Sequence, residues 1–235
     1  MAAVLDAIRV LDFGRYIAGP FCAALLADLG ADVIRVEKVR GSEDRFVIPL
    51  NEAGDGAMFM QVNRNKRGLT LNPMKPDGRE VVRRLVATAD VVVANLPDSA
   101  LTAMGLDYRS LAAVRPDVIL TSVSAFGAGG PLSGKLGFDG IGQAMSSAMY
   151  LSGRPGEPTK SYVPWVDFTP ALSATVGTLA ALLEIDLDII AELLEQTFAS
   201  KAHMVESNLE AIRLGYDYTS EHFKCPLPAK VEKLG

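Results

Sequence analysis

The stretch IRVLDFGRYIAGPFCAALLADLGADVIRVEK, residues 8–38, decides the expected fold. Residues 8–14 form a β-branched run that ends in Asp-Phe-Gly, which predicts a strand and its turn. Residues 19–30 carry Pro20 near a first helical turn, apolar residues at helical spacing and a terminal glycine, which predicts a helix. Residues 31–38 predict a second strand. A strand, a helix and a strand in this order predict a parallel sheet with a right-handed crossover.

The same alternation continues along the chain. Strand and helix patterns follow one another over the first ~125 residues, which predicts the α/β class and a Rossmann-like, doubly wound parallel sheet. The glycine-rich residues 127–142 predict a loop over a site. Thr169 as N-cap and Pro170 as first residue predict the start of a long helix that runs to residue 184.

The composition excludes several classes of protein. The 235 residues are 49% hydrophobic and 22% charged with a net charge of −5, so a nucleic-acid-binding surface is not expected. We expect neither a signal peptide nor a membrane span. Cys22 and Cys225 lie far apart, which is typical of a cytoplasmic protein. Only His203 and His222 are present, which argues against a metal site or a His-dependent triad.

One carboxylate stands out in SYVPWVDFTPALSATVGTLAALLE, residues 161–184. Tyrosine aside, Asp167 is its only ionisable group before the closing glutamate. Removing a carboxylate from water costs several kcal/mol unless it is paired or hydrogen-bonded. Asp167 therefore either supports the backbone at the helix start or is kept there to react. The turn DFGRYIAGP lacks a G-x-G-x-x-G pattern and no Walker lysine pattern is present, so nicotinamide and nucleotide-hydrolysing enzymes are not expected.

Residues 1–184 closely resemble the family III coenzyme A transferases. The matching segments, in order, are VLDFGRYIAGPFCAALLADLGADVIRVEK, NRNKRGLTLNPMKPDGR, ADVVVANLPDSALTAMGLDY, VILTSVSAFGAGGP, GFDGIGQAMSS and VDFTPALSATVGTLAALLE. The resemblance implies that Asp167 is a covalent nucleophile that accepts the acyl group of an acyl-CoA. It also implies a carboxylic-acid acceptor, CoA as a substrate with no tightly bound cofactor, and a homodimer.

The CoA site can be expected from the residues and from the resemblance together. NRNKRG places Arg64, Lys66 and Arg67 in a span suited to the phosphates of CoA. For Arg64 and Arg67 taken singly, a solvated strand edge is an equal alternative. Lys135 in the glycine-rich loop could reach a phosphate or serve only solubility. The resemblance implies further contacts near the nucleotide end of CoA and around its adenine and ribose, at Lys38, Leu71, Asn72 and Asn95.

Three further positions bear on the resemblance to the family. The family commonly has an arginine immediately before Met104, where this chain has Ala103. The related racemases carry a histidine where this chain has Phe138, and a phenyl ring cannot move a proton, so a racemase is the less expected alternative. Asp139 follows, and we interpret it as a structural residue.

The resemblance stops at residue 184, so we expect two parts: residues 1–184 as the CoA-binding α/β domain and residues 185–235 as a helical tail. Within the tail, ESNLEAIRLGYDY at 206–218 resembles the last helices of the γ-type domain of 2-oxoacid:ferredoxin oxidoreductases. Three hypotheses follow: a shortened CoA transferase, a CoA-binding module or hybrid chain without turnover, or a subunit that docks onto a 2-oxoacid oxidoreductase.

Overall fold

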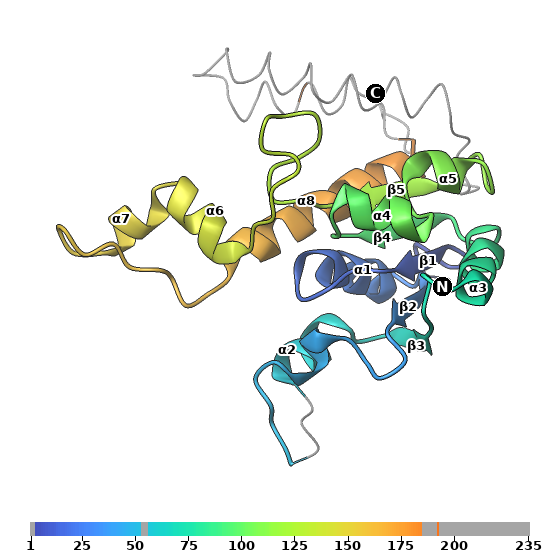
Figure 1. The fold of residues 1–235 in the computed structure, drawn as a ribbon, viewed down its shortest axis with the longest axis horizontal. Helices are drawn as coiled ribbons and strands as arrows, with labels where there is room; N and C mark the ends of the chain where they lie inside the picture. Colours follow the sequence, from blue (N-terminus) through green and yellow to red (C-terminus); the bar gives the residue numbers. More distant parts are fainter. Residues whose placement is uncertain (1–2, 53–55, 185–191, 193–235) are drawn as a thin grey trace.

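Five parallel strands form one sheet in the computed structural model, which describes residues 3–52, 56–184 and 192 (Figure 1). The strand order is β3-β2-β1-β4-β5, with helices on both faces. The predicted α/β class and doubly wound parallel sheet are therefore confirmed. The strands are β1 (Arg9–Asp12), β2 (Asp32–Glu37), β3 (Lys66–Thr70), β4 (Val91–Ala94) and β5 (Ile119–Ser122).

Side chains that alternate along the central strands divide the core into two layers. Val10, Val33 and Val91 belong to a cluster with α1 (Ala18–Asp28) and α8 (Trp165–Leu182). The intervening strand residues belong to the opposite cluster, because successive side chains of a strand point to opposite faces. That second cluster is completed by α3 (Pro76–Val86), α4 (Asp98–Met104) and α5 (Tyr108–Ala112).

Four short helices lie outside these layers. The short helix η1 (Glu43–Phe46) and α2 (Ala57–Val62) connect β2 to β3. Between β5 and α8 the chain forms α6 (Asp139–Met145) and α7 (Ala148–Ser152), which lie off to one side of the sheet (Figure 1). The helix α8 then runs from beside α6 back onto the sheet, so it joins this lateral arm to the core.

The start of α8 corrects one sequence prediction. The helix begins at Trp165 with Pro164 as N-cap, so Thr169 is not the N-cap and Pro170 lies inside the helix. Pro170 can donate no hydrogen bond to the Val166 carbonyl four residues earlier, which usually disfavours this position. Packing of the helix against α1 and a cap supplied by α6 outweigh this local preference. Asp167 consequently lies in the first turn of the helix.

The site region follows from the strand order. The topological switch point of the sheet lies between the adjacent strands β1 and β4. From β1 the chain adds β2 and β3 on one side, and it then adds β4 and β5 on the other side. In open α/β sheets ligands bind at the carboxyl ends of the strands beside such a point. The turns that follow β1, β4 and β5 are therefore where a ligand is expected.

Several sequence predictions fall outside this description. The tail, Cys225, both histidines and the proposed likeness to an oxidoreductase domain lie outside the described residues.

Among the described residues, none of the helices combines the length and hydropathy of a membrane span. Cys22 is a buried free thiol, and burial raises its pKa to about 11. The cytoplasmic location and the domain boundary at residue 184 stay predictions.

Candidate active site

A pocket of about 430 Å³ lies at the carboxyl ends of β4 and β5. Its size is typical of small-molecule sites in proteins. The pocket brings together three residues that the sequence singled out: Asn95 after β4, Lys135 in the glycine-rich loop and Asp167 in α8. Residues 133–138 of the predicted loop line the pocket, whereas residues 139–142 of that prediction form the start of α6. Two of the loop glycines adopt positive φ angles, 70° at Gly127 and 75° at Gly129.

Asp167 is half-buried in the wall of this pocket. Burial, and after it the charge of Asp139, raises the pKa of this carboxyl from an ordinary 3.8 to about 6, against the opposing effect of Lys160. Among the described residues, its carboxylate has no hydrogen-bond or ion-pair partner. The amide at the helix start, Val166 N–H, is instead bound by Asp139 at 3.1 Å. The Asp167 carboxylate is thus poorly solvated, mostly ionised at neutral pH and not occupied with holding the backbone.

The Asn95 side chain joins the ends of the two central strands. Its Oδ1 accepts the Arg15 N–H at 2.7 Å, and its Nδ2 donates to the Arg15 carbonyl at 2.8 Å. A Cβ at Gly19 would lie 2.9 Å from Asn95 Oδ1, so glycine is needed for α1 to approach this closely. Asn95 therefore lines the pocket while its amide fixes the turn after β1.

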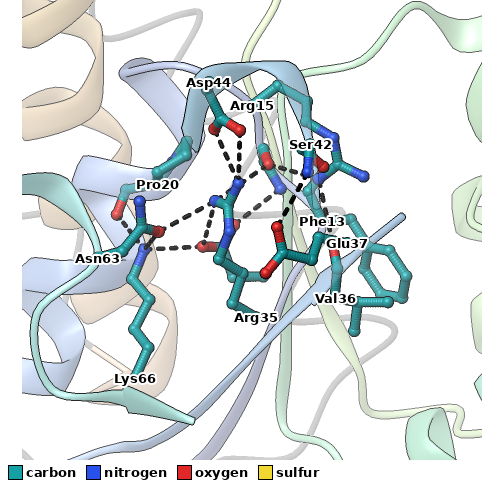
Figure 2. Close-up of polar contacts among 12 residues, drawn as sticks. Phe13, Arg15, Pro20, Arg35, Val36, Glu37, Ser42, Asp44, Asn63 and Lys66 are labelled. Atoms are coloured by element: carbon teal, nitrogen blue, oxygen red, sulfur yellow. Dashed lines mark hydrogen bonds and ion pairs between the residues drawn. The ribbon is translucent and has the colours of Figure 1, made fainter. Parts of the chain in front are cut away.

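Lys66 is placed differently from the sequence prediction. Its side chain is 2% exposed, and Nζ contacts Asp12 Oδ2 at 2.8 Å, the Pro20 carbonyl at 2.7 Å and Asn63 Oδ1 at 2.9 Å (Figure 2). An ammonium group has three hydrogens to donate, and these contacts use all three. The structure therefore argues against Lys66 as the phosphate ligand that the sequence predicts.

Lys66 belongs to a buried charged cluster that was not predicted from the sequence. Asp12 is fully buried and forms ion pairs with Lys66 and Arg35. Arg35 in turn donates twice to Asp44, at 3.0 and 2.7 Å (Figure 2). Burial alone would raise the pKa of Asp12, but the two cations outweigh it and the pKa lies below its ordinary value. Asp12 Oδ1 also accepts the Gly14 N–H at 2.7 Å. This cluster shapes the turn after β1, and its only sequence signal is charge inside strands that are otherwise apolar.

Arg67 and Arg64 lie away from the pocket. Arg67 pairs with Asp32, the first residue of β2, at 2.6 Å, and Arg64 pairs with Asp28. Asp32 is also bound by Arg9, the first residue of β1, so the Arg67 pair lies at the amino edge of the sheet. The ligand-binding edge is the opposite one, so this placement favours the solvated strand edge for Arg67.

The other predicted CoA contacts follow β2 and β3, on the far side of β1 from the pocket. Lys38 pairs with Glu43, and both side chains are exposed. Leu71 is 9% exposed in the core, and Asn72 Oδ1 accepts the Met74 N–H at 3.0 Å. These three residues lie at the carboxyl edge of the sheet, but they do not line the described pocket.

Phe138 connects the glycine-rich loop to the turn after β1. Its ring meets the Tyr16 ring edge-to-face, with centroids 5.8 Å apart, and Phe138 also lines the pocket. Tyr16 has a φ of 57°, a left-handed conformation that presents the ring from the β1 turn. Nothing in the sequence singles out Tyr16, because such a backbone angle at a tyrosine leaves no sequence signal.

The profile of CoA-transferase family III matches residues 5–188. The chain belongs to CoA-transferase family III. It is 39% identical over 187 residues to a succinate–glutarate CoA-transferase of Agrobacterium fabrum. This alignment covers 76% of the chain and 47% of the relative. It is 34% identical over 182 residues to the human succinyl-CoA:glutarate CoA-transferase, covering 77% of the chain and 42% of the relative.

A solved structure is also similar. A CAIB/BAIF family protein from Brucella suis superposes with a TM-score of 0.73 at 38% identity, over 78% of this chain and 50% of that one. The chain therefore spans about half the length of the relatives that it matches. The family match includes the strands and the segment that carries Asp167.

Proposed function

We propose that the chain transfers CoA from an acyl-CoA donor to a carboxylic-acid acceptor, with Asp167 as the nucleophile. Membership of CoA-transferase family III supports the reaction class. The observation that carries the residue assignment is the state of Asp167, a half-buried carboxylate with a raised pKa in the wall of the pocket. A weakly solvated carboxylate at that place is suited to attack a bound thioester.

The proposed reaction needs no oxidant, and overall it neither takes up nor releases a proton. An Asp167 oxygen attacks the thioester carbonyl, the C–S bond breaks, and a mixed anhydride and the CoA thiolate result. The thiolate then attacks the Asp167 carbonyl carbon, which releases the donor acid and leaves an aspartyl-CoA thioester. The acceptor carboxylate attacks this thioester and forms a second anhydride. The returning thiolate attacks the acceptor carbonyl, so acyl-CoA leaves and the Asp167 carboxylate is regenerated.

CoA would lie along the carboxyl edge of the sheet. Lys135 in the pocket wall would contact a phosphate, and Lys38, Leu71 and Asn72 would extend the same edge toward the nucleotide. Asn95 would shape the wall through its two bonds to Arg15. CoA enters as a substrate in this proposal, and no tightly bound cofactor takes part in any step.

The names of the relatives indicate a substrate class. Relatives are named for succinate with glutarate, for D-citramalate and for mesaconate, all of them short dicarboxylic acids. We infer that this chain also uses a short dicarboxylic acid as donor or acceptor. A transfer assay with succinyl-CoA should give faster turnover with glutarate or mesaconate than with butyrate, which lacks the second carboxylate. Equal rates with all three acids would contradict this inference.

The experiment that tests the nucleophile is trapping of the intermediate. The protein is incubated with succinyl-CoA, treated with hydroxylamine and digested, and the peptide that contains Asp167 is analysed by mass spectrometry. We expect a hydroxamate at Asp167 in the wild type and none in Asp167→Asn. An unmodified Asp167 in protein that still binds CoA would contradict the proposal.

The same outcome would favour a second function. A CoA-binding module without turnover is the alternative candidate, because the pocket and the family membership support binding of CoA whether or not a covalent step follows. In that case isothermal titration would detect CoA binding, while neither the hydroxamate nor CoA transfer would be observed.

We also infer that the chain forms a homodimer. The lateral arm exposes large apolar side chains, which usually mark a contact surface. On α6 and α7 these are Ile141, Met145, Tyr150 and Leu151, with exposed fractions from 46% to 88%.

A further inference from the structure

Asp139 is buried beside the start of α8 and binds three groups there. Its exposed fraction is 5%, and it is the first residue of α6. Its Oδ1 accepts the Val166 N–H at 3.1 Å. Its Oδ2 accepts a hydrogen bond from Gln143 Nε2 at 2.7 Å and forms an ion pair with Lys160 Nζ at 2.9 Å. Both carboxylate oxygens are therefore occupied by the segment that leads into the helix of Asp167.

The contact with Val166 acts as a helix cap supplied by another helix. The first amides of a helix have no partner within it. The N-cap of α8 is Pro164, which has no side-chain oxygen to offer. The Asp139 carboxylate takes over this function, and its negative charge is favourable at a helix N-terminus.

Gln143, one turn further along α6, holds the same segment. It is 1% exposed, and its Oε1 accepts the Ser161 N–H at 2.8 Å. The two helices also meet closely at Gly142, where a Cβ would lie 2.4 Å from Val166 Cγ1. The chain between Ser161 and Val166 is thus bound at both ends by α6.

This arrangement determines where the Asp167 carboxylate points, because Val166 is the residue directly before it. We propose that Asp139 is a positioning residue for Asp167: by binding the Val166 amide and Gln143 it fixes the first turn of α8 and directs the Asp167 carboxylate into the pocket. The catalytic consequence rests on the proposed function, whereas the positional claim can be tested without turnover.

The charges around Asp167 support this relation. Asp139 from α6 raises the pKa of Asp167, after the larger effect of burial, and Lys160 lowers it. Lys135 and Asp98 are the other charged residues of the described chain that line the pocket. Asp139 therefore influences both the position and the charge of the proposed nucleophile.

The test compares Asp139→Ala and Asp139→Asn with a matched control, Asp107→Ala. Asp107 caps α5 by accepting the Ser110 N–H at 3.1 Å, and it does not line the pocket. The first measurement is the rate constant for modification of Asp167 at saturating succinyl-CoA, and the second is the dissociation constant of CoA. Asp139→Asn keeps the size of the side chain and serves if the alanine variant fails to fold.

We expect the Asp139 variants to lower the rate constant at least about tenfold, because a small misplacement of a reacting group has effects of this size. The dissociation constant of CoA should change less than about twofold, and the control should leave both quantities within that limit. An unchanged rate constant, or equal losses in rate and CoA affinity, would overturn the positioning claim.

A second readout separates this claim from the proposed function. Carbon-labelled aspartate gives an NMR signal for Asp167, assigned by its loss in Asp167→Asn. In Asp139→Asn the titration midpoint of this signal should move to lower pH, because a like charge has been removed. If wild-type protein is never modified by succinyl-CoA, the proposed function fails, and the positioning claim is then decided by a crystal structure of Asp139→Ala, in which the Asp167 carboxylate should be displaced from the pocket wall. A carboxylate that keeps its place in that variant would overturn the claim.

Discussion

At the level of single residues, the raised pKa of Asp167 implies a cost to stability. Its folded-state pKa of about 6 lies above the ordinary 3.8. A group with a raised pKa contributes stability that is fully present below the ordinary pKa and is lost as pH rises through the folded pKa. The ionised carboxylate is therefore disfavoured in the folded protein at neutral pH, as is common for groups that are kept for chemistry.

Asp167→Asn should consequently stabilise the protein at pH 8 and have no such effect below pH 4. After allowance for solvent screening of a half-buried group, the expected gain in the free energy of unfolding is roughly 1–2 kcal/mol. Urea unfolding of both proteins at the two pH values measures it. A variant that is less stable than the wild type at pH 8 would show that the carboxylate supports the backbone instead.

Lys66 and Arg67 are neighbours in the sequence with opposite environments. Lys66→Met would leave Asp12 buried without its closest cation, which should lower the free energy of unfolding by about 3–5 kcal/mol. Arg67→Met removes an exposed pair with Asp32 and should cost about 0–1 kcal/mol. Urea unfolding compares the two variants. A stable Lys66→Met protein with weakened CoA binding would restore Lys66 to the CoA site.

At the scale of elements, α8 shows where local sequence signals give the wrong boundary. Thr169-Pro170 is a typical helix start, but the helix begins at Trp165 because Asp139 supplies a cap from α6. A capping partner that comes from another part of the chain leaves no pattern near the helix start. The opening strand, helix and strand were predictable, because each boundary there carries its own local signal.

The boundary can be tested by comparing two substitutions. Thr169→Ala should change the free energy of unfolding by less than about 0.5 kcal/mol, because Thr169 is an exposed residue within the helix. Asp107→Ala removes a true N-cap and should cost about 1 kcal/mol. Thermal or urea unfolding measures both. A loss of about 1 kcal/mol in Thr169→Ala would instead place the helix start at Thr169.

For the whole molecule, the parallel sheet and the position of the pocket were predictable, while the surroundings of two predicted CoA contacts were not. Asp167 and Lys135 meet in the pocket because both follow the carboxyl edge of the sheet, which the strand pattern determines. Successive side chains of a strand point to opposite faces of the sheet. For that reason Lys66 and Arg67, which are neighbours in β3, have different partners: Lys66 lies in a buried cluster, and Arg67 pairs with Asp32 at the amino edge of the sheet.

The inferred homodimer makes a prediction at the same scale. Leu151 is 88% exposed on α7, and Leu151→Glu should shift the molecular mass in sedimentation equilibrium from dimer to monomer, because it places a charge on the apolar arm. Val81→Glu on α3 is the control, since Val81 is 43% exposed away from the arm, and it should leave the mass unchanged. A wild-type protein that sediments as a monomer would contradict the inference.

If Asp167 itself carries CoA between the two acids, an oxygen atom of the acceptor acid should be transferred to Asp167, and this transfer can be measured. In the proposed steps the acceptor carboxylate gives one oxygen to Asp167 when the second anhydride breaks. Turnover of succinyl-CoA with glutarate labelled with heavy oxygen, followed by digestion and mass spectrometry, measures that oxygen. We expect heavy oxygen in the peptide that contains Asp167, and none there in Asp167→Asn. CoA transfer that proceeds while Asp167 stays unlabelled would contradict it.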